Sequence, residues 1–282
     1  MESPNTEQIR YWNEEAGQKW VRFQDFLDTQ IRPLGRKAME RAALRPGERV
    51  LDVGCGCGDT TVEIGQRVSP GGQVLGVDIS APMLERARQR ATEAGQTNVA
   101  FVQADAQIHA FPPQHYDAVF SRFGVMFFAN PVEAFSNLRS ATKPAGRLAF
   151  VCWQALPENP WMAVPLMAAL PLLLAPELPN PDAPGPFAFA NPDKVRRILE
   201  QAGYRSIEFE TVRELLALGA DAPLEQVVDF LLQMGPTGKL LREVSVDLRQ
   251  RVAEAVYEAL RPYATPQGVR MEGTAWIVTA TA

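Results

Sequence analysis

The sequence predicts an α/β protein with a mostly parallel sheet of seven strands and helices on both faces. Two observations lead to this prediction. Short apolar runs alternate with segments of helical periodicity across residues 46–155, as they do in right-handed βαβ units. The run from Val50 to Thr61 also reads as a buried strand, a turn with glycine at every second position and the start of a helix. Such a turn brings bare backbone close to a ligand, so we expect a binding site there.

The overall composition excludes several classes of protein. Hydrophobic residues make up 46% and charged residues 22%, as in an ordinary globular protein. A net charge of −5 without a run of Lys and Arg argues against a nucleic-acid binder. No apolar segment approaches the roughly 20 residues that span a bilayer, so no membrane span is expected. Three cysteines cannot all pair within one chain, and the N-terminus carries no secretory signal. We therefore expect a cytoplasmic protein.

Residues 1–45 are predicted to form an N-terminal helical cap. Apolar and aromatic side chains recur there every three or four residues, which puts them on one helix face. They are Ile9, Trp12, Ala16, Trp20 and Phe23. A turn at residues 45–48 separates this cap from the core.

Residues 46–155 are predicted to form the core of the sheet and to bind the ligand. Glycine- and proline-rich turns at residues 70–72 and 143–146 return the chain to the sheet. The expected strands are residues 50–53, 74–78, 100–102, 117–120 and 148–151, and the expected helices are residues 60–68, 81–94 and 131–142.

The alternation stops after Trp153. Residues 156–191 are rich in proline, and residues 179–186 cannot form regular structure. Segments that follow the carboxyl ends of parallel strands lie over the ligand crevice, so we expect this insert to be a lid or a substrate wall. A surface loop without a role is the alternative.

Residues 192–282 are predicted to complete the core and to carry a helical insert at residues 221–262. The expected elements are a helix at 192–202, a strand at 206–212, helices at 224–234 and 240–260, and a last strand at 276–280.

The spacing of the glycines indicates the kind of ligand. Dinucleotide-binding proteins carry Gly-x-Gly-x-x-Gly, whereas Gly54, Gly56 and Gly58 follow Gly-x-Gly-x-Gly. The third dinucleotide glycine is replaced by Asp59, whose carboxylate would repel a pyrophosphate. A ligand without phosphate, such as S-adenosylmethionine, tolerates that charge. An NAD(P)-dependent oxidoreductase stays the alternative that the turn alone allows.

Several landmarks in residues 45–152 resemble the class I S-adenosylmethionine-dependent methyltransferases. Residues 51–58 (Leu-Asp-Val-Gly-Cys-Gly-Cys-Gly) are similar to their motif I, and Asp78 to the acidic residue that ends their second strand. Asp105-Ala106 matches the acidic-Ala pair after the third strand. Residues 116–122 and 144–148 are similar to the motif IV region and to the turn before strand five. The resemblance implies a Rossmann-like fold and is closest to bacterial enzymes that methylate quinones and natural products at carbon or oxygen.

Each cofactor-binding residue has a chemical reason. Asp52 is expected to receive the ligand ammonium, directly or through water. Thr60 opens a helix, so its hydroxyl and the neighbouring N–H groups are expected to hold the carboxylate. Asp78 would accept hydrogen bonds from both ribose hydroxyls and Asp105 from the adenine amine. An isolated carboxylate at a strand end is otherwise a solvated group or a helix cap, and Cys55 most simply contributes backbone. The full expected set is Tyr11, Asp52, Gly54, Cys55, Gly56, Thr60, Asp78, Ile79, Met83, Asp105, Ala106, Gln107 and Ser121.

The sequence says less about the acceptor and the chemistry. Methyl transfer from a sulfonium needs mainly orientation and desolvation. His109 is the candidate base, with a residue packed near adenine as the alternative, and no metal is expected. Aromatic residues predict a small apolar or aromatic methyl acceptor, although part of them must be ordinary core. The substrate candidates are Trp20, Arg122, Phe123, Phe127, Trp153 and Trp161.

Two further possibilities stay open. A protein that binds the cofactor without turnover would show the same sequence landmarks. A homodimer is equally compatible with the sequence.

Overall fold

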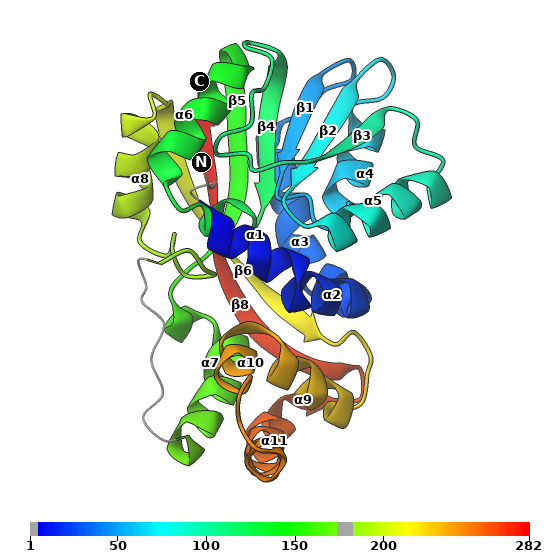
Figure 1. Ribbon diagram of the computed structural model, residues 1–282, viewed down its shortest axis with the longest axis vertical. Coiled ribbons are helices and arrows are strands. Elements are labelled where there is room, and N and C mark those ends of the chain that lie inside the picture. The colour runs from blue at the N-terminus through cyan, green and yellow to red at the C-terminus, as the bar shows by residue number, and fades with distance from the viewer. Residues whose placement is uncertain (1–4, 174–182) are drawn as a thin grey trace.

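The computed structural model describes residues 5–173 and 183–282 of the chain (Figure 1). Its eight-stranded sheet has the order β3-β2-β1-β4-β5-β8-β6, with β7 paired to β8. The predicted α/β class and the mostly parallel sheet are confirmed. The strands are β1 Arg49–Val53, β2 Gln73–Asp78, β3 Val99–Gln103, β4 Tyr116–Arg122, β5 Thr142–Trp153, β6 Arg205–Leu218, β7 Ala264–Thr265 and β8 Gly268–Thr281.

The strand order creates a crevice beside β1. Strands β1 to β5 pair in parallel, whereas β8 runs antiparallel between β5 and β6. From β1 the chain continues to β2 and β3 on one side of the sheet, and then crosses to β4 and β5 on the other side of β1. The order of the strands therefore reverses at β1. Ligands of open α/β sheets bind at this point, outside the carboxyl ends of the strands. Val50 to Val53 are all buried, as in a strand covered on both faces.

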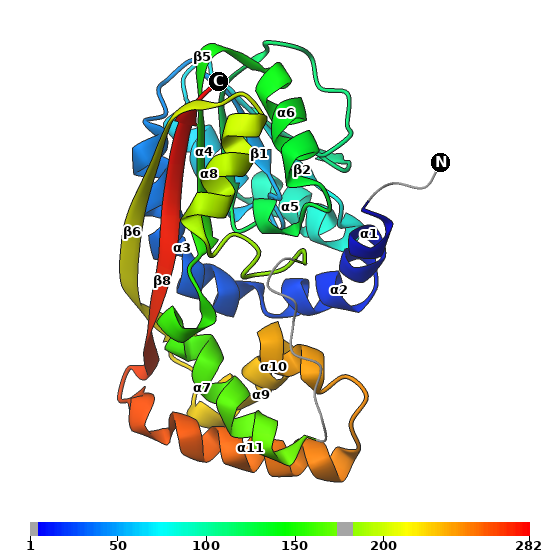
Figure 2. The ribbon, with the colours of Figure 1, turned by 90° about the vertical axis from the view of Figure 1, so that its left-hand side faces the viewer.

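Helices cover both faces of the sheet. One layer contains α3, α4 and α5, and the other contains α6 and α8 (Figure 2). Asn130 and Asn191 cap α6 and α8, each followed by a proline that suits the first turn of a helix. The bounds are α3 Gln24–Ala42, α4 Asp59–Arg67, α5 Ala81–Glu93, α6 Pro131–Ala141 and α8 Pro192–Gln201.

A group of helices lies beyond the sheet, where the long strands β6 and β8 extend past it (Figures 1 and 2). In this group α7 packs against α11 and α10, and α9 packs against both of the latter. The bounds are α7 Pro160–Ala169, α9 Leu224–Gln233, α10 Gly235–Leu240 and α11 Val246–Leu260. Short 3-10 helices occupy Val125–Phe127, Leu156–Glu158, Leu170–Leu172 and Arg261–Tyr263.

Three expectations about elements were wrong in detail. The helix expected over residues 240–260 is broken, because the side chain of Ser245 accepts a hydrogen bond from the Leu248 amide and starts α11. The last strand begins at Gly268 instead of Trp276, because it pairs along nearly all of β6. The N-terminal cap is divided into α1 Thr6–Asn13, α2 Glu15–Arg22 and α3. Its first two helices lie against the carboxyl ends of the parallel strands (Figure 1).

The proline-rich insert is described in part. Residues 174–182, and with them part of the stretch expected to be irregular, lie outside the described residues. Residues 156–173 contain α7, which packs on β8 and α11. After the gap, the Gly185 amide donates to the Met126 carbonyl and Phe189 is buried against Phe135. The described parts of the insert thus pack on the core and on the outer helices.

No helix within residues 5–173 and 183–282 combines the length and the apolar character needed to cross a bilayer. All three cysteines are buried free thiols.

The contact between α4 and α5 can be tested at the glycine that begins α4. Gly58 has a φ of +80°, and a Cβ there would meet Ala87 Cβ at 2.8 Å. Gly47 has a φ of +86°, but nothing lies within 4 Å of its Cβ position. We expect Gly47→Ala to lower the free energy of unfolding by about 1–2 kcal/mol through strain alone. Gly58→Ala should cost about 1–3 kcal/mol more, because it also overpacks the contact with α5.

Urea denaturation of both variants measures the difference. Equal losses for Gly47→Ala and Gly58→Ala would contradict the tight packing of α4 on α5.

Candidate functional site

A pocket lies at the carboxyl ends of β1, β2, β3 and β4. It contains about 890 Å³ of space between atoms, part of it open to solvent. Its wall combines the glycine turn after β1 with residues that follow β2, β3 and β4 and with parts of the N-terminal helices.

The glycine turn depends on glycine for two reasons. Gly54, Gly56 and Gly58 have φ values of +67°, +54° and +80°, which side chains rarely adopt. A Cβ on Gly54 would also meet the Cα of Gly124 at 2.7 Å, so the turn touches the loop after β4 backbone to backbone. The Gly54 and Cys55 amides both donate to the Val77 carbonyl. The turn is therefore fixed against both neighbours of β1.

Two carboxylates enter the pocket from adjacent strands. Asp78 accepts hydrogen bonds from the Gly56 amide at 2.8 Å and the Ser80 amide at 2.9 Å, and burial raises its pKa despite these donors. Asp105 accepts from the Gln107 amide at 3.0 Å and from Asn5 Nδ2 at 2.8 Å. Each carboxylate is held by local N–H groups at a strand end and lines the pocket.

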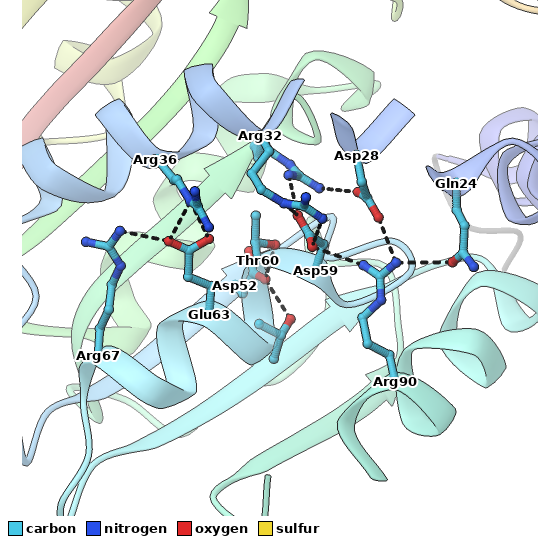
Figure 3. Close-up of polar contacts among 12 residues, drawn as sticks. Gln24, Asp28, Arg32, Arg36, Asp52, Asp59, Thr60, Glu63, Arg67 and Arg90 are labelled. Atoms are coloured by element: carbon cyan, nitrogen blue, oxygen red, sulfur yellow. Dashed lines mark hydrogen bonds and ion pairs between the residues drawn. The ribbon is translucent and has the colours of Figure 1, made fainter. Parts of the chain in front are cut away.

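A third carboxylate lies behind the turn. Asp52 is fully buried, and its Oδ2 accepts from the Thr60 hydroxyl at 2.7 Å and the Thr61 hydroxyl at 2.6 Å (Figure 3). Its Oδ1 has no hydrogen-bond partner. Burial raises the pKa of Asp52 to about 6, and the two hydroxyls oppose this. A buried acceptor without a partner is rare and calls for a donor from a ligand or water.

A cluster of ion pairs joins the N-terminal helix α3 to α4, α5 and the end of β4 (Figure 3). We call Asp28, Asp59, Arg32, Arg90 and Arg122 the ion cluster. Arg122 Nη1 donates to Asp59 at 2.8 Å and its Nη2 to Asp28 at 3.0 Å. Burial alone would raise the pKa of Asp59, but the nearby arginines lower it to about 2.

These pairs correct one step of the sequence argument. The charge of Asp59 is compensated by arginines, and Asp59 is not among the residues that line the pocket. Its carboxylate therefore does not repel a pyrophosphate in the way the sequence suggested. Of the two arguments from the sequence, only the spacing of the glycines still favours S-adenosylmethionine over a dinucleotide.

Aromatic side chains form another part of the pocket wall. Trp12 meets Trp20 at 5.6 Å and Phe127 at 5.3 Å in edge-to-face contacts, and all three line the pocket. Phe123 has a φ of +59° and stacks on Trp153 at 4.2 Å. A bulky residue in the left-handed region costs on the order of 1–3 kcal/mol and often marks a functional site.

The N-terminal helices are fastened over the pocket by hydrogen bonds. Asn5 accepts from the Ala129 amide at 2.8 Å while it donates to Asp105. Asn13 donates to the Ile79 carbonyl at 2.8 Å and accepts from the Ala81 amide at 2.9 Å. These contacts cover the side of the pocket near β2 and β3.

Comparison with known proteins assigns the segment that builds this pocket. Residues 50–146 match the model of a family described as a methyltransferase domain. Residues 50–146 form a methyltransferase domain. The matched segment begins in β1, contains the glycine turn and extends through β4 to the start of β5.

Two curated relatives match the methyltransferase domain and its surroundings. Aklanonic acid methyltransferase DauC from Streptomyces sp. strain C5 is 36% identical over 118 residues, which cover 42% of this chain and 54% of that protein. The ubiquinone/menaquinone biosynthesis C-methyltransferase UbiE from Pseudomonas savastanoi pv. phaseolicola is 36% identical over 149 residues, 52% of this chain and 58% of that protein. The chain thus spans little more than half the length of these curated relatives.

A solved structure extends the similarity of the fold beyond the matched domain. Phosphoethanolamine N-methyltransferase 2 from Haemonchus contortus, in complex with phosphomonomethylethanolamine and S-adenosylhomocysteine, has a TM-score of 0.52 and 19% identity. The alignment covers 89% of this chain and 52% of that one. At this identity the likeness shows a shared fold.

Most of the expected site residues meet at the pocket of the methyltransferase domain. The structure brings together Gly54, Cys55, Gly56, Thr60, Asp78, Ile79, Met83, Asp105 and Ala106 with Trp20, Arg122, Phe123 and Phe127. Asp52 lies directly behind them, bonded to Thr60.

Six other expected residues do not line the pocket. Tyr11 lies beneath the Arg242 guanidinium, 4.8 Å from it, and Gln107 bonds Glu133. The Ser121 hydroxyl donates to the Val53 carbonyl, and His109 packs on Phe111. Trp153 stacks on Phe123, and the ring of Trp161 packs against Trp153 with 5.2 Å between the ring centroids.

The pocket also contains residues that the sequence did not assign to it, namely Asn5, Trp12, Asp28, Ile31, Val53, Cys57, Val77, Ala104, Gly124 and Phe128. Asp28 carried a signal, because it is a charged residue one turn from Ile31 on an apolar helix face. Asn5 carried none, because its partners are about a hundred residues away.

Both thiols in the turn are buried. Burial raises the pKa of Cys57 to about 12 and that of Cys55 well above its ordinary value. Among residues 5–173 and 183–282, no three His, Cys, Asp or Glu side chains are grouped so that they could hold a metal ion.

The buried carboxylate gives a prediction about pH. Folding raises the pKa of Asp52 from 3.8 to about 6, so the folded state binds its proton more tightly than the unfolded chain. Its charge therefore costs stability, and the free energy of unfolding falls as pH rises from about 4 to about 6. Asp52→Asn removes this dependence. Without ligand, its stability relative to the wild type should rise by about 2–3 kcal/mol between pH 4 and pH 7.

Urea denaturation at both pH values measures this difference. Asp117→Asn is the control, because hydrogen bonds and nearby cations lower the pKa of Asp117 despite some burial, so its relative stability should change in the opposite direction. A difference between Asp52→Asn and the wild type that does not change with pH would contradict the account.

Proposed function

We propose that the protein is an S-adenosylmethionine-dependent methyltransferase that methylates a small apolar or aromatic metabolite. The observation that carries this proposal is the carboxylate of Asp78, held at the end of β2 by the Gly56 amide of the glycine turn and facing the pocket. Asp78 lies within the matched methyltransferase domain. We propose that it accepts hydrogen bonds from the two ribose hydroxyls of the cofactor.

The other cofactor contacts follow from the strand order. Asp105 and Ala106 at the end of β3 suit the polar edge of adenine, and Ile79 and Met83 offer it apolar surface. Asp52 Oδ1, buried without a partner, suits the ammonium group, directly or through water. The negative charges of Asp52, Asp78 and Asp105 also suit a ligand with a net positive charge. When bound, S-adenosylmethionine supplies an activated methyl group.

The chain's own contribution is then orientation and exclusion of water. The N-terminal helices cover the cofactor pocket, and Trp12, Trp20, Phe123 and Phe127 surround the remaining space with apolar surface. Holding the acceptor in line with the sulfonium in such a site supplies most of what methyl transfer requires. His109 does not line the pocket, so we assign it no role.

The acceptor class is supported by this wall and by the relatives. Trp12, which contacts both Trp20 and Phe127, forms with them an aromatic surface that suits a flat apolar acceptor. The names of two relatives refer to quinone biosynthesis and to aklanonic acid, both of which concern small molecules. A nicotinamide-dependent oxidoreductase is not favoured, because the matched methyltransferase domain contains the same glycine turn that first allowed it. A protein without turnover is likewise not favoured.

We also propose a cytoplasmic location, which the three buried free thiols support. A homodimer stays a prediction.

The ribose contact can be tested by calorimetry with S-adenosylhomocysteine. Asp78→Ala removes the charged acceptor for the ribose hydroxyls, so binding should weaken by about 1.5–3 kcal/mol. Asp117→Ala, at the opposite end of the sheet beside Lys143, should bind like the wild type. Unchanged affinity in a folded Asp78→Ala variant would show that the ribose lies elsewhere. Tight binding of NADH without binding of S-adenosylhomocysteine would contradict the proposed cofactor.

The acceptor wall can be tested at Phe123. A panel of phenols and hydroxynaphthoquinones, with product formation followed by mass spectrometry, first identifies an accepted substrate. Phe123→Leu keeps an apolar side chain but removes the ring, so KM for that acceptor should rise by about 2–10-fold, the size of an aromatic contact. Affinity for S-adenosylhomocysteine should stay unchanged. Phe111→Leu, outside the pocket, is the matched control, and an equal rise in KM for both variants would argue against an acceptor contact.

A further inference from the structure

We infer that Arg122 binds the carboxylate at the amino-acid end of the cofactor, with Asp28 and Asp59 positioning its guanidinium. This inference rests on the cofactor proposed above. It differs from the sequence expectation, which gave the carboxylate to Thr60 and Arg122 to the acceptor.

The hydroxyl of Thr60 is already used. It donates to Asp52 Oδ2 at 2.7 Å, and a hydroxyl has one proton to donate. Beside the backbone N–H groups at the start of α4, any side-chain donor to a ligand carboxylate must therefore come from another residue.

The charges on the pocket wall select that donor. Asp28, Asp78 and Asp105 line the pocket, and Arg122 is the one cationic side chain among the described residues that do so. A carboxylate placed beside Asp78 or Asp105 would be repelled, and in a partly buried site this repulsion is strong. The charge of Asp28 is instead compensated by Arg90 and Arg122. The negative end of a zwitterionic ligand is therefore directed to Arg122.

The strand order puts Arg122 at the correct end of the ligand. Asp105 follows β3, Asp78 ends β2, the glycine turn follows β1 and Arg122 ends β4. These strands are neighbours in the order β3-β2-β1-β4. At about 4.8 Å per strand, the row from β3 to β4 is about 14 Å long. A ligand with its base at β3 and its ribose at β2 brings its amino-acid end across the turn to β4.

The guanidinium is fixed in position before any ligand arrives. Its Nη1 and Nη2 donate to Asp59 and Asp28. These two aspartates are themselves paired with Arg32 and Arg90 (Figure 3). Gly35 of α3 leaves room for the stem, because a Cβ there would meet Arg122 Cδ at 2.6 Å. A guanidinium has five N–H donors, so two bonds to aspartates leave donors for a ligand.

The charge of the ion cluster completes the argument. It contains three arginines and two aspartates, so it holds one positive charge more than it neutralises within itself. A ligand carboxylate at Arg122 would balance that charge. Asp28 and Asp59 act as positioning residues in this arrangement, since each holds the guanidinium at a fixed angle.

Two ligands that differ in the amino-acid end test the inference. S-adenosylhomocysteine carries that end, and 5′-methylthioadenosine shares the adenosine and the thioether but lacks it. Calorimetry should show that Arg122→Gln weakens S-adenosylhomocysteine by about 10–100-fold, as expected for hydrogen bonds to a charged group. The affinity for 5′-methylthioadenosine should change less than about twofold, within the effect of small side-chain readjustment.

The matched control is Arg90→Gln. Arg90 belongs to the same cluster and pairs with Asp28 and Asp59, but it does not line the pocket. Any change it causes should be the same for both ligands. Equal losses for both ligands in Arg122→Gln, or unchanged binding of S-adenosylhomocysteine, would overturn the inference.

A measurement on the wild type covers the case in which Arg122→Gln does not fold. S-adenosyl-3-thiopropylamine keeps the amine of S-adenosylhomocysteine but lacks the carboxylate, so it should bind at least about tenfold more weakly. Equal affinity would overturn the inference. Arg122→Lys keeps the buried charge and should reduce this difference between the two ligands, because lysine lacks the forked donor geometry. If the wild type binds none of the three compounds, the cofactor proposal itself fails.

Discussion

The contact between the backbones of Gly54 and Gly124 is the constraint on which the site depends. A methyl group on either residue would lie within 2.8 Å of the other's Cα, so no side chain separates the turn after β1 from the loop after β4. Phe123, the residue before Gly124, lies in the left-handed region and lines the pocket. The same turn gives its Gly56 amide to Asp78. The glycine turn is therefore bonded to the proposed ribose contact, Asp78, and touches the loop that carries Phe123.

The ion cluster connects the helices that surround the pocket to the end of β4. Arg122 extends from the end of β4 between α3 and α4 and pairs with an aspartate on each. A buried pair contributes little net stability, but removal of one partner leaves an uncompensated charge and is costly. The cluster thus specifies how α3 docks, and with it the place of Asp28 and Ile31 in the pocket wall. A carboxylate bound there would contact a guanidinium that already pairs with both α3 and α4.

Much of the fold and part of the site could be predicted from the sequence, because those features are local. The runs at β1, β2 and β4, the glycine turn and the acidic residues at strand ends each follow from a few adjacent residues. The pairing of Asp59 with Arg122 joins residues 63 apart, and the bonds of Asn5 join residues about a hundred apart, so no local pattern announces them. The break before α11 was missed because one serine cap interrupts an otherwise helical pattern.

The central claim is that this pocket holds S-adenosylmethionine in an extended form across four strand ends. A crystal structure of the protein with S-adenosylhomocysteine tests it most directly. The account predicts adenine beside Asp105 and Met83, the ribose hydroxyls on Asp78, and the amino-acid end beyond the glycine turn at Arg122. A ligand bound in the reverse direction, or outside this pocket, would contradict it.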